Sequence, residues 1–352
     1  METQPGTKPA TAVANPTDDW YEHGFARVEN SRKRGVSSMP LPYAQTLIKW
    51  ASYVPGADLS GMLVLDPACG SGNTLIAATQ ALAARGRVRR WGAERVAQEI
   101  ERCIWGLDPD PIACHVTDLR LRRMIAHIIP ELPATRRKTL QLHIHQTDSL
   151  TLPADARFKL VITNPPLATA RGVVVSYGGF ESKTPPRDVW LRFLEQSMGL
   201  TAWGGALAIA LPEAFLIKPS AAALRAELGQ EWTLEHLAHV TGVFRSGPGT
   251  VLLLLRRTPP PPDAQVRWER IERLSLSRMA YLNDADAEDG EAAPEVPAER
   301  PRTIHSRAAR SERRRDGTLP QTDIAAGRSP WRYALGETER AFLAKLDQPY
   351  GA

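Results

Sequence analysis

The sequence predicts an α/β fold built on a doubly wound, mostly parallel sheet. Short apolar segments alternate with segments of helical periodicity, which is the order expected of strands that are each followed by a crossover helix. The first strand runs into a glycine-rich turn and then a helix, and open α/β sheets bind ligands at such turns. Two apolar segments near the end of this pattern are joined by a short connection, which predicts an antiparallel hairpin at the edge of the sheet.

Each element follows from its local pattern. Strands are expected at short, mostly apolar runs, namely 62–65, 103–107, 160–163, 206–211, 234–240 and 251–256, and also at 143–145. Helices are expected where apolar residues recur at three- and four-residue spacing, namely a helix entered at Pro42 and those over 74–84, 111–129, 190–198 and 220–228. The final hairpin uses the strands on either side of 241–250.

Composition divides the 352 residues into three parts. Residues 1–35 are polar and rich in proline and threonine, which predicts a disordered leader. Residues 36–257 hold the alternating pattern and are expected to form one domain. Residues 258–352 are expected to be a partly disordered extension, with a stiff proline run, an acidic linker, an Arg-rich segment and a short final helix, at 259–262, 283–300, 301–316 and 331–347.

Charge and cysteine content narrow the class of protein. The formal net charge of +5 permits a nucleic-acid partner without requiring one. Arginine clusters at 85–90, 120–123 and 302–315 are each expected to be solvated faces. No apolar run reaches 18 residues, so we expect no membrane span. Cys69, Cys103 and Cys114 lack metal-ligand spacing, and so few cysteines favour the reducing cytoplasm.

The stretch MLVLDPACGSGNTLIAA at 62–78 holds the first chemical motif. Asp66 ends the strand, and Gly70 and Gly72 allow a tight turn that a ligand can approach closely. The spacing is neither G-x-G-x-x-G nor a Walker loop, and a carboxylate at the strand end repels phosphate. It suits a positive ammonium group, such as the methionine part of S-adenosylmethionine. A purely structural turn is the alternative.

Acidic residues also end the next two predicted strands. Asp108, in GLDPDPIA, is placed to accept hydrogen bonds from ribose hydroxyls. Asp148, in TDSL, is placed to accept from an adenine amino group. Either residue alone is more often a helix cap or turn residue, but three acids at successive strand ends favour one nucleoside-containing ligand.

Taken in order, these motifs resemble those of the gamma class of adenine-specific DNA methyltransferases, the N-6 DNA methylases. The quoted segments are LDPACGSGNTLIAA, GLDPDPIA, TDSL and TNPPL, and the later blocks GGALAIALPEAFLIKPSAAALRAEL and VFRSGPGTVLLLLRR continue the resemblance. It covers about residues 36–257 and implies a Rossmann-like class I methyltransferase sheet. It implies S-adenosylmethionine as cofactor, bound by Asp66, Pro67, Ala68, Gly70, Gly72, Asp108, Pro109, Asp148, Ser149 and Asn164.

The catalytic set implied by the resemblance is Asn164, Pro165, Pro166, Leu167 and Phe244. The exocyclic amine of adenine is a poor nucleophile because its lone pair is delocalised into the ring. The side-chain oxygen of Asn164 and the backbone carbonyl of Pro165 can each accept a hydrogen bond from this amine, which makes its lone pair available for attack. The two prolines fix the backbone that carries these acceptors. A plain strand exit ended by prolines is the alternative.

Leu167 is the clearest departure from the family pattern, which has an aromatic residue there to stack on the extruded base. Stacking on an aromatic ring contributes roughly 1–3 kcal/mol per base, so we expect binding of the base to be weakened about tenfold or more. Phe244 matches the family's second aromatic, although an ordinary core phenylalanine is the alternative.

The resemblance therefore implies site-specific methylation of adenine in DNA, in a restriction-modification or phage-defence system. Fewer than 100 residues follow Arg257, which is short for a recognition domain, so we expect a separate specificity or defence-system subunit as partner. Two alternatives stay open: an RNA or protein-glutamine methyltransferase, and a weakly active or non-catalytic subunit of a DNA-binding assembly. Methylation assays on DNA, ribosomal RNA and release factor distinguish them.

Overall fold

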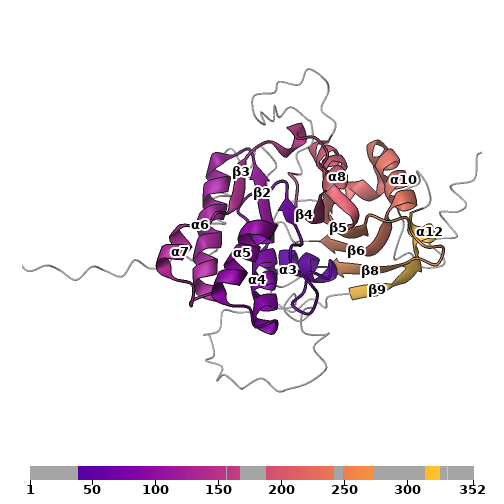
Figure 1. Ribbon diagram of the computed structural model, residues 1–352. Coiled ribbons are helices and arrows are strands. Elements are labelled where there is room, and N and C mark those ends of the chain that lie inside the picture. The colour runs from indigo at the N-terminus through magenta and orange to yellow at the C-terminus, as the bar shows by residue number, and fades with distance from the viewer. Residues whose placement is uncertain are drawn as a thin grey trace, which may run out of the picture.

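The computed structural model describes residues 39–155, 157–166, 188–241, 249–272, 314–325 and 331. Within them a nine-stranded sheet runs in the order β3-β2-β1-β4-β5-β7-β6-β8-β9 (Figure 1). The strands are β1 Val64–Asp66, β2 Ile104–Asp108, β3 His143–Gln146, β4 Phe158–Thr163, β5 Thr201–Pro212, β6 Thr233–Thr241, β7 Thr250–Arg256, β8 Gln265–Glu272 and β9 Arg314–Pro320. This confirms the predicted α/β class.

The helices fall between the strands as the alternating pattern predicts. They are α3 Leu41–Trp50, α4 Asn73–Val88, α5 Ala93–Cys103, α6 Pro111–Ile128, α7 Ala134–Lys138, α8 Val189–Leu200, α9 Ala214–Ile217, α10 Ala222–Glu231 and α12 Gln321–Ile324, with the 3₁₀ turns η1 Ser149–Thr151 and η2 Pro219–Ala221. The sequence did not predict α5, α7 or the single-turn helices α9 and α12. Helix α5 is strongly amphipathic, but its buried face consists only of Val96, Ala97, Ile100 and Cys103, and most of its other residues are charged.

The strands β3, β2, β1, β4 and β5 are mutually parallel. Strand β7 pairs antiparallel with both β5 and β6, so β6 runs in the same direction as β5. One edge of the sheet, here called the carboxyl edge, therefore collects the ends of β1 to β6 and the beginning of β7. This topology is what brings residues far apart in sequence to one place.

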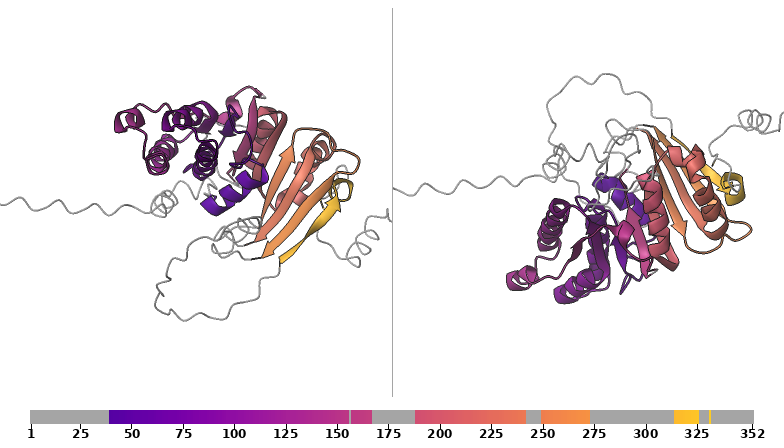
Figure 2. Two further views of the ribbon diagram at one scale, coloured as in Figure 1. Left: turned by 60° about the horizontal axis from the view of Figure 1, so that its bottom comes forward. Right: turned by 90° about the horizontal axis from the view of Figure 1, so that it is seen from above.

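Successive residues along the central strands face opposite layers of helices. Val64 and Leu160 belong to the apolar layer that includes residues of α3 and α4. Leu65 and Val161 belong to the layer that includes residues of α8 and α10. Figure 2 shows these helices on the two faces of the sheet. Because both faces are covered, the central strands consist almost wholly of apolar residues.

The sheet continues beyond Arg257, where the sequence predicted the domain to end. Strand β8 pairs in parallel with β6, beginning at His236↔Arg267, and β9 pairs antiparallel with β8. The hairpin of β6 and β7 is therefore internal, and β9 forms the edge. The proline run is a short connection that turns at Pro261, whose carbonyl accepts the Ala264 amide at 2.9 Å. Composition concealed β8 because four of its eight residues are charged, and Arg267, Glu269 and Arg270 separate the buried Val266 from Ile271.

Two of the predicted arginine clusters are only partly solvated. Arg85 and Arg120 are buried, with 2% and 4% of their surface exposed. Arg85 donates to the carbonyls of Pro55 and Gly56, both at 3.0 Å. The expectation of a solvated face is wrong for these two residues, because the carbonyl groups they bind lie in loops distant in sequence. Residues 302–313 lie outside the described part of the chain.

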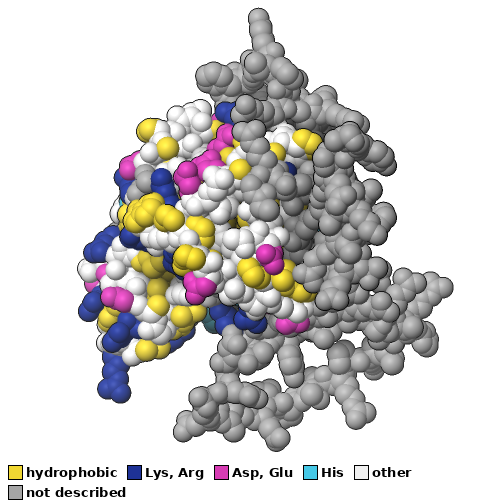
Figure 3. All heavy atoms as spheres, turned by 90° about the vertical axis from the view of Figure 1, so that its right-hand side faces the viewer, with side chains coloured by type: hydrophobic (Ala, Val, Ile, Leu, Met, Phe, Trp, Pro, Cys, Tyr) yellow, Lys and Arg dark blue, Asp and Glu magenta, His cyan; other side chains and the backbone are white. Residues whose placement is uncertain are grey.

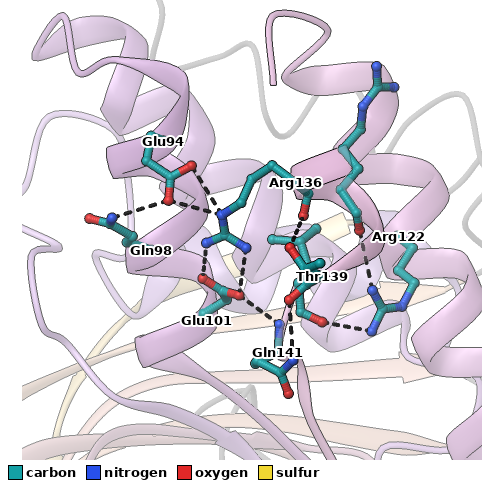
Figure 4. Close-up of polar contacts among 9 residues, drawn as sticks. Glu94, Gln98, Glu101, Arg122, Arg136, Thr139 and Gln141 are labelled. Atoms are coloured by element: carbon teal, nitrogen blue, oxygen red, sulfur yellow. Dashed lines mark hydrogen bonds and ion pairs between the residues drawn. The ribbon is translucent and has the colours of Figure 1, made fainter. Parts of the chain in front are cut away.

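Another arginine joins α5 to α7, as Figure 4 shows. Arg136 donates to Glu94 at 3.0 Å and forms a paired contact with Glu101, with its Nη1 at 3.1 Å. The amide of Gln141 also donates to Glu101, at 2.6 Å. Burial alone raises the pKa of a carboxyl, but the hydrogen bonds from Arg136 and Gln141 prevail and lower the pKa of Glu101. This contact fixes the segment that leads into β3.

In the part of the chain that the structure describes, no helix is both long and apolar enough to cross a membrane. Cys69, Cys103 and Cys114 are buried free thiols, and the described residues form no group of three or more potential metal ligands.

Trp331 tests whether the region after Arg257 stabilises the domain. It is only 2% exposed, its amide donates to the Leu216 carbonyl at 2.9 Å, and its ring meets Phe215 edge-on at 5.2 Å between centroids. We expect Trp331→Ala to lower the free energy of unfolding by about 3–5 kcal/mol. Denaturant unfolding checks this against Trp203→Ala, which truncates a tryptophan that is 64% exposed and should have little effect. Equal effects of the two substitutions would contradict it.

Candidate functional site at the carboxyl edge

The glycine loop between β1 and α4 is held by two neighbouring elements. From β2, the Leu107 carbonyl accepts the Cys69 amide at 2.9 Å, and Asp108 Oδ2 accepts the Gly70 amide at 3.0 Å. From α6, Thr117 Oγ1 donates to the Gly70 carbonyl at 2.8 Å, and the Arg120 guanidinium donates to the Ser71 carbonyl at 2.5 Å. Amides and carbonyls of the loop are thus satisfied in a fixed shape. We call these four contacts the loop clamp.

The two predicted loop glycines serve different purposes. Both have positive φ, +52° at Gly70 and +84° at Gly72, which favours glycine. A Cβ on Gly72 would lie 2.8 Å from Thr117 Cγ2, so this glycine lets α6 pack against the loop. A Cβ on Gly70 would meet no described atom within 4 Å. Gly70 therefore borders open space above the loop, where a ligand can approach the backbone.

Asp66 lies beneath the loop and is 1% exposed. Its Oδ1 accepts the Ala68 amide at 2.9 Å, and its Oδ2 accepts the Thr74 hydroxyl. Burial raises the pKa of Asp66 to about 6, although the hydrogen bonds from Thr74 and Ala68 oppose this shift. The sequence predicted a carboxylate open to a ligand, whereas the structure engages both oxygens within the chain.

The two other acids lie at the carboxyl edge, as predicted. Asp108 is half-buried, and its Oδ1 also accepts the Asp110 amide at 2.9 Å, just after Pro109. Asp148 caps η1 by accepting the Leu150 amide at 3.0 Å. Ser149 is buried and donates from its hydroxyl to the Pro67 carbonyl at 2.7 Å, which ties the end of β3 to the glycine loop. Both acids therefore have the turn and cap contacts that were the alternative to ligand binding, while remaining partly exposed.

Asn164 comes directly after β4, which lies between β1 and β5. The parallel register pairs Leu65 with Val161, so Asn164 emerges at the same edge as the glycine loop. Asn164 is half-buried, and Pro165 and Pro166 are buried. Leu167 and Phe244, the other predicted catalytic residues, lie outside the described part of the chain.

Comparison with known proteins identifies the family. The family model described as N-6 DNA Methylase matches residues 20–247. This chain belongs to the N-6 DNA methylase family. No individually curated protein matches it by sequence.

Several solved structures share the fold of this N-6 DNA methylase. A modification subunit of a putative type I restriction enzyme from Vibrio vulnificus is 19% identical with a TM-score of 0.54, over 78% of this chain and 57% of that one. The M protein of the type I restriction enzyme EcoKI is 18% identical with a TM-score of 0.50, over 68% and 49%. The type IIG restriction endonuclease BpuSI is 17% identical with a TM-score of 0.56, over 86% and 33%. The matches thus span about half the length of the two type I proteins.

The residues that shape the loop from α6 were not predicted. Thr117 and Arg120 are one turn apart on a helix whose local sequence resembles any amphipathic helix. Their role depends on how α6 packs against α4 and β2, which is a tertiary contact. Thr74 and Asp110 were detectable in principle, because a hydroxyl in the first turn after the loop and an Asp-Pro start of a helix are local signals.

The raised pKa of Asp66 predicts a pH dependence of stability in this N-6 DNA methylase. Between its ordinary value of 3.8 and about 6, the folded state keeps a proton that the unfolded state releases. The free energy of unfolding of the wild type should therefore fall as pH rises from 4 to 6, relative to Asp66→Asn, by about 2 kcal/mol. Asparagine retains an acceptor for Ala68 and gains a donor toward Thr74. Urea unfolding at stepped pH values measures the difference.

Asp58→Asn supplies a control of opposite sign. The hydrogen bonds from Ser60 lower the pKa of the exposed Asp58, so its contribution to stability is present at neutral pH and disappears as pH falls below 4. If wild type and Asp66→Asn keep a constant difference between pH 4 and 6, the assigned environment of Asp66 is wrong.

Proposed function

We propose that this chain transfers a methyl group from S-adenosylmethionine to the exocyclic amine of adenine in DNA, as the methyltransferase component of a restriction-modification or related defence system. The observation that supports this best is the placement of Asn164, Pro165 and Pro166 at the end of β4, beside the clamped glycine loop. Family membership and neighbours described as type I modification subunits point the same way.

The residues around the loop fit the proposed cofactor. Bound S-adenosylmethionine supplies a methyl group activated by a sulfonium. Gly70 leaves room for it over the loop, and the backbone of Pro67 and Ala68 borders the same turn. Asp108 is held by two amides with part of its surface exposed, which suits ribose hydroxyls, and Asp148 with Ser149 is proposed for the adenine end beside Pro109.

Asp66 is proposed to act without direct contact. Both of its oxygens accept hydrogen bonds within the chain, so we propose that it favours the ligand's ammonium group through its charge and not through direct contact. When ionised it places negative charge beneath the loop, which favours a cationic ligand above it. Its second contribution is to fix Ala68 and Thr74 at the two ends of the turn.

Asn164 and Pro165 are proposed to activate the adenine amine. The Asn164 side-chain oxygen accepts a hydrogen bond from one N–H of the amine, and the Pro165 carbonyl accepts a hydrogen bond from the other. These two hydrogen bonds draw the nitrogen toward tetrahedral geometry. With the lone pair free, in-line attack on a sulfonium methyl would form the N–C bond as the S–C bond breaks. The bonding electrons would stay on sulfur as a neutral thioether, and the methylated amine would then lose one proton to solvent. Because the proline rings fix φ and both prolines are buried, the acceptors need little reorganisation.

DNA is the proposed substrate and the base must leave the helix stack to reach Asn164. Leu167 in place of an aromatic residue is the feature that favours the second candidate, a weakly active or non-catalytic subunit. A chain from a structure described as showing complex assembly of a type I restriction-modification system is also similar. Its TM-score is 0.56 and its identity 14%, over 94% of this chain and 67% of that one. We propose a separate specificity subunit as partner and the cytoplasm as the site of action.

Asn164→Ala tests the proposed chemistry. The full chain is expressed with its neighbouring genes in a host free of DNA methylation, and modified adenines are mapped by long-read sequencing. The wild type should modify adenines within one sequence motif. Loss of one of two preorganised acceptors should reduce methylation at least about a hundredfold. Gln98→Ala, which removes an exposed amide on α5, should retain full activity.

Three results would contradict the proposal. Full methylation by Asn164→Ala would remove the assigned role. Transfer by the wild type to ribosomal RNA or release factor alone would change the substrate class. Binding of S-adenosylmethionine without transfer to DNA, with every neighbouring gene product present, would favour the non-catalytic candidate.

A further inference from the structure

An acid and a histidine lie across the beginning of β7 at the carboxyl edge. Glu213 is the first residue after β5, and its amide donates to the Gly249 carbonyl at 2.8 Å. Its Oε2 lies 3.0 Å from Nε2 of His239, which belongs to β6. The Glu213 side chain therefore reaches from the end of β5, past the residue before β7, to the strand beyond.

The contact between Glu213 and His239 requires a residue without a side chain at position 249. A Cβ on Gly249 would lie 2.3 Å from Glu213 Oε2 and 2.6 Å from His239 Nε2. The φ angle of Gly249 is not positive, so backbone conformation does not require glycine there. The requirement is space, because the Glu213–His239 pair lies directly over this residue.

The pair lies at the edge that carries the proposed methyl-transfer site. The register pairs Pro212 with Thr250, and Thr250 with Val240, so the ends of β5 and β6 flank the start of β7. Strand β5 also pairs with β4, which Asn164 follows. The Glu213 side chain is 43% exposed and the His239 side chain 13%, so the pair borders solvent instead of forming part of the apolar core.

We propose that Glu213 and His239 are positioning residues for methyl transfer. The pair joins the ends of β5 and β6 across Gly249, and so fixes the end of β5, the strand that pairs directly with β4 ahead of Asn164. This inference rests on the proposed function, because a reaction that needs two acceptors aligned on one amine is sensitive to small displacements of the surrounding edge. Misplacement of about 1 Å can reduce the rate of such a reaction about a hundredfold.

A purely structural role is the rival explanation, and its consequences differ. The cofactor contacts proposed at Gly70, Asp108 and Asp148 lie on the other side of β4, along β1, β2 and β3. Breaking the pair should therefore change the methyl-transfer step and leave cofactor affinity intact. A general loss of structure would change both together.

Three single substitutions break the pair in different ways. Glu213→Ala and His239→Ala each remove one partner. Gly249→Ala leaves both partners in the chain but inserts a methyl group where the carboxylate lies. We expect each to lower the single-turnover methylation rate of the full chain, assayed with its partner subunits, about tenfold to a hundredfold. The Kd for S-adenosylmethionine should change by less than about twofold.

Conservative and combined variants separate positioning from folding. Glu213→Gln keeps an acceptor for His239 and should recover most of the rate lost in Glu213→Ala. Once Glu213 and His239 are both alanine, adding Gly249→Ala should cost nothing further, because these changes share one mechanism. Gly56→Ala and Glu231→Ala are the matched controls: a Cβ on Gly56 meets no described atom within 4 Å, and Glu231 is exposed.

The outcomes are distinguishable. An active wild type with pair variants at the wild-type rate overturns this inference and leaves the proposed function standing. Pair variants whose rate, cofactor affinity and unfolding midpoint fall together, without recovery in Glu213→Gln, show a structural role and also overturn it. A wild type that methylates no adenine overturns the proposed function and this inference with it.

Discussion

The structure depends first on the clamp that holds the loop between β1 and α4. A tight turn with two positive-φ glycines leaves backbone amides and carbonyls that need hydrogen-bond partners. Without those partners, nothing would hold the turn in a single conformation. Here β2 provides acceptors for two amides and α6 provides donors for two carbonyls. Since Thr117 and Arg120 are buried, these contacts form only when α6 is packed. The shape of the proposed cofactor site is therefore a consequence of the whole first half of the sheet.

The strand topology then brings further residues of the proposed site to the same carboxyl edge as the loop. β4 places Asn164 beside the loop, and β5, β6 and β7 bring Glu213, His239 and Gly249 to the same edge. Proposed cofactor contacts gather on one side of β4, and the Glu213–His239 pair lies on the other. This arrangement makes the two steps of the proposed reaction, cofactor binding and alignment of the amine, separable by mutation.

Much of the fold was predictable because it depends on local patterns. Every strand expected between residues 62 and 256 is present, and for the buried strands β1, β4, β5 and β7 this is because their sequences are mainly apolar. Strands β8 and β9 were missed because charged residues such as Arg267 make up half of β8, and the surrounding composition resembles a linker. Trp331 closes the core from beyond this region, and the sequence showed only the start of a helix there.

The candidate site also contains both residues that the sequence predicted and residues that it could not predict. Asp66, Asp108, Asp148 and Asn164 were placed at strand ends by the sequence, and the structure brings them to one edge. The enclosure of Asp66 was not predictable, because it follows from contacts with Ala68 and Thr74 in the folded turn. Thr117, Arg120 and the Glu213–His239 pair were not predictable either, since each acts on a residue at least 26 positions away.

The most direct test of this account is the affinity for S-adenosylmethionine of Thr117→Val, measured by isothermal titration calorimetry. The substitution preserves the shape of the side chain while removing the hydrogen-bond donor to the Gly70 carbonyl. The control is Thr139→Val, because Thr139 is exposed, follows the last residue of α7 and also donates to a backbone carbonyl. Loss of a buried hydrogen-bond partner costs roughly 1–3 kcal/mol, so the account predicts affinity reduced about tenfold or more in a folded protein. Wild-type affinity in folded Thr117→Val would show that the clamp does not shape the cofactor site.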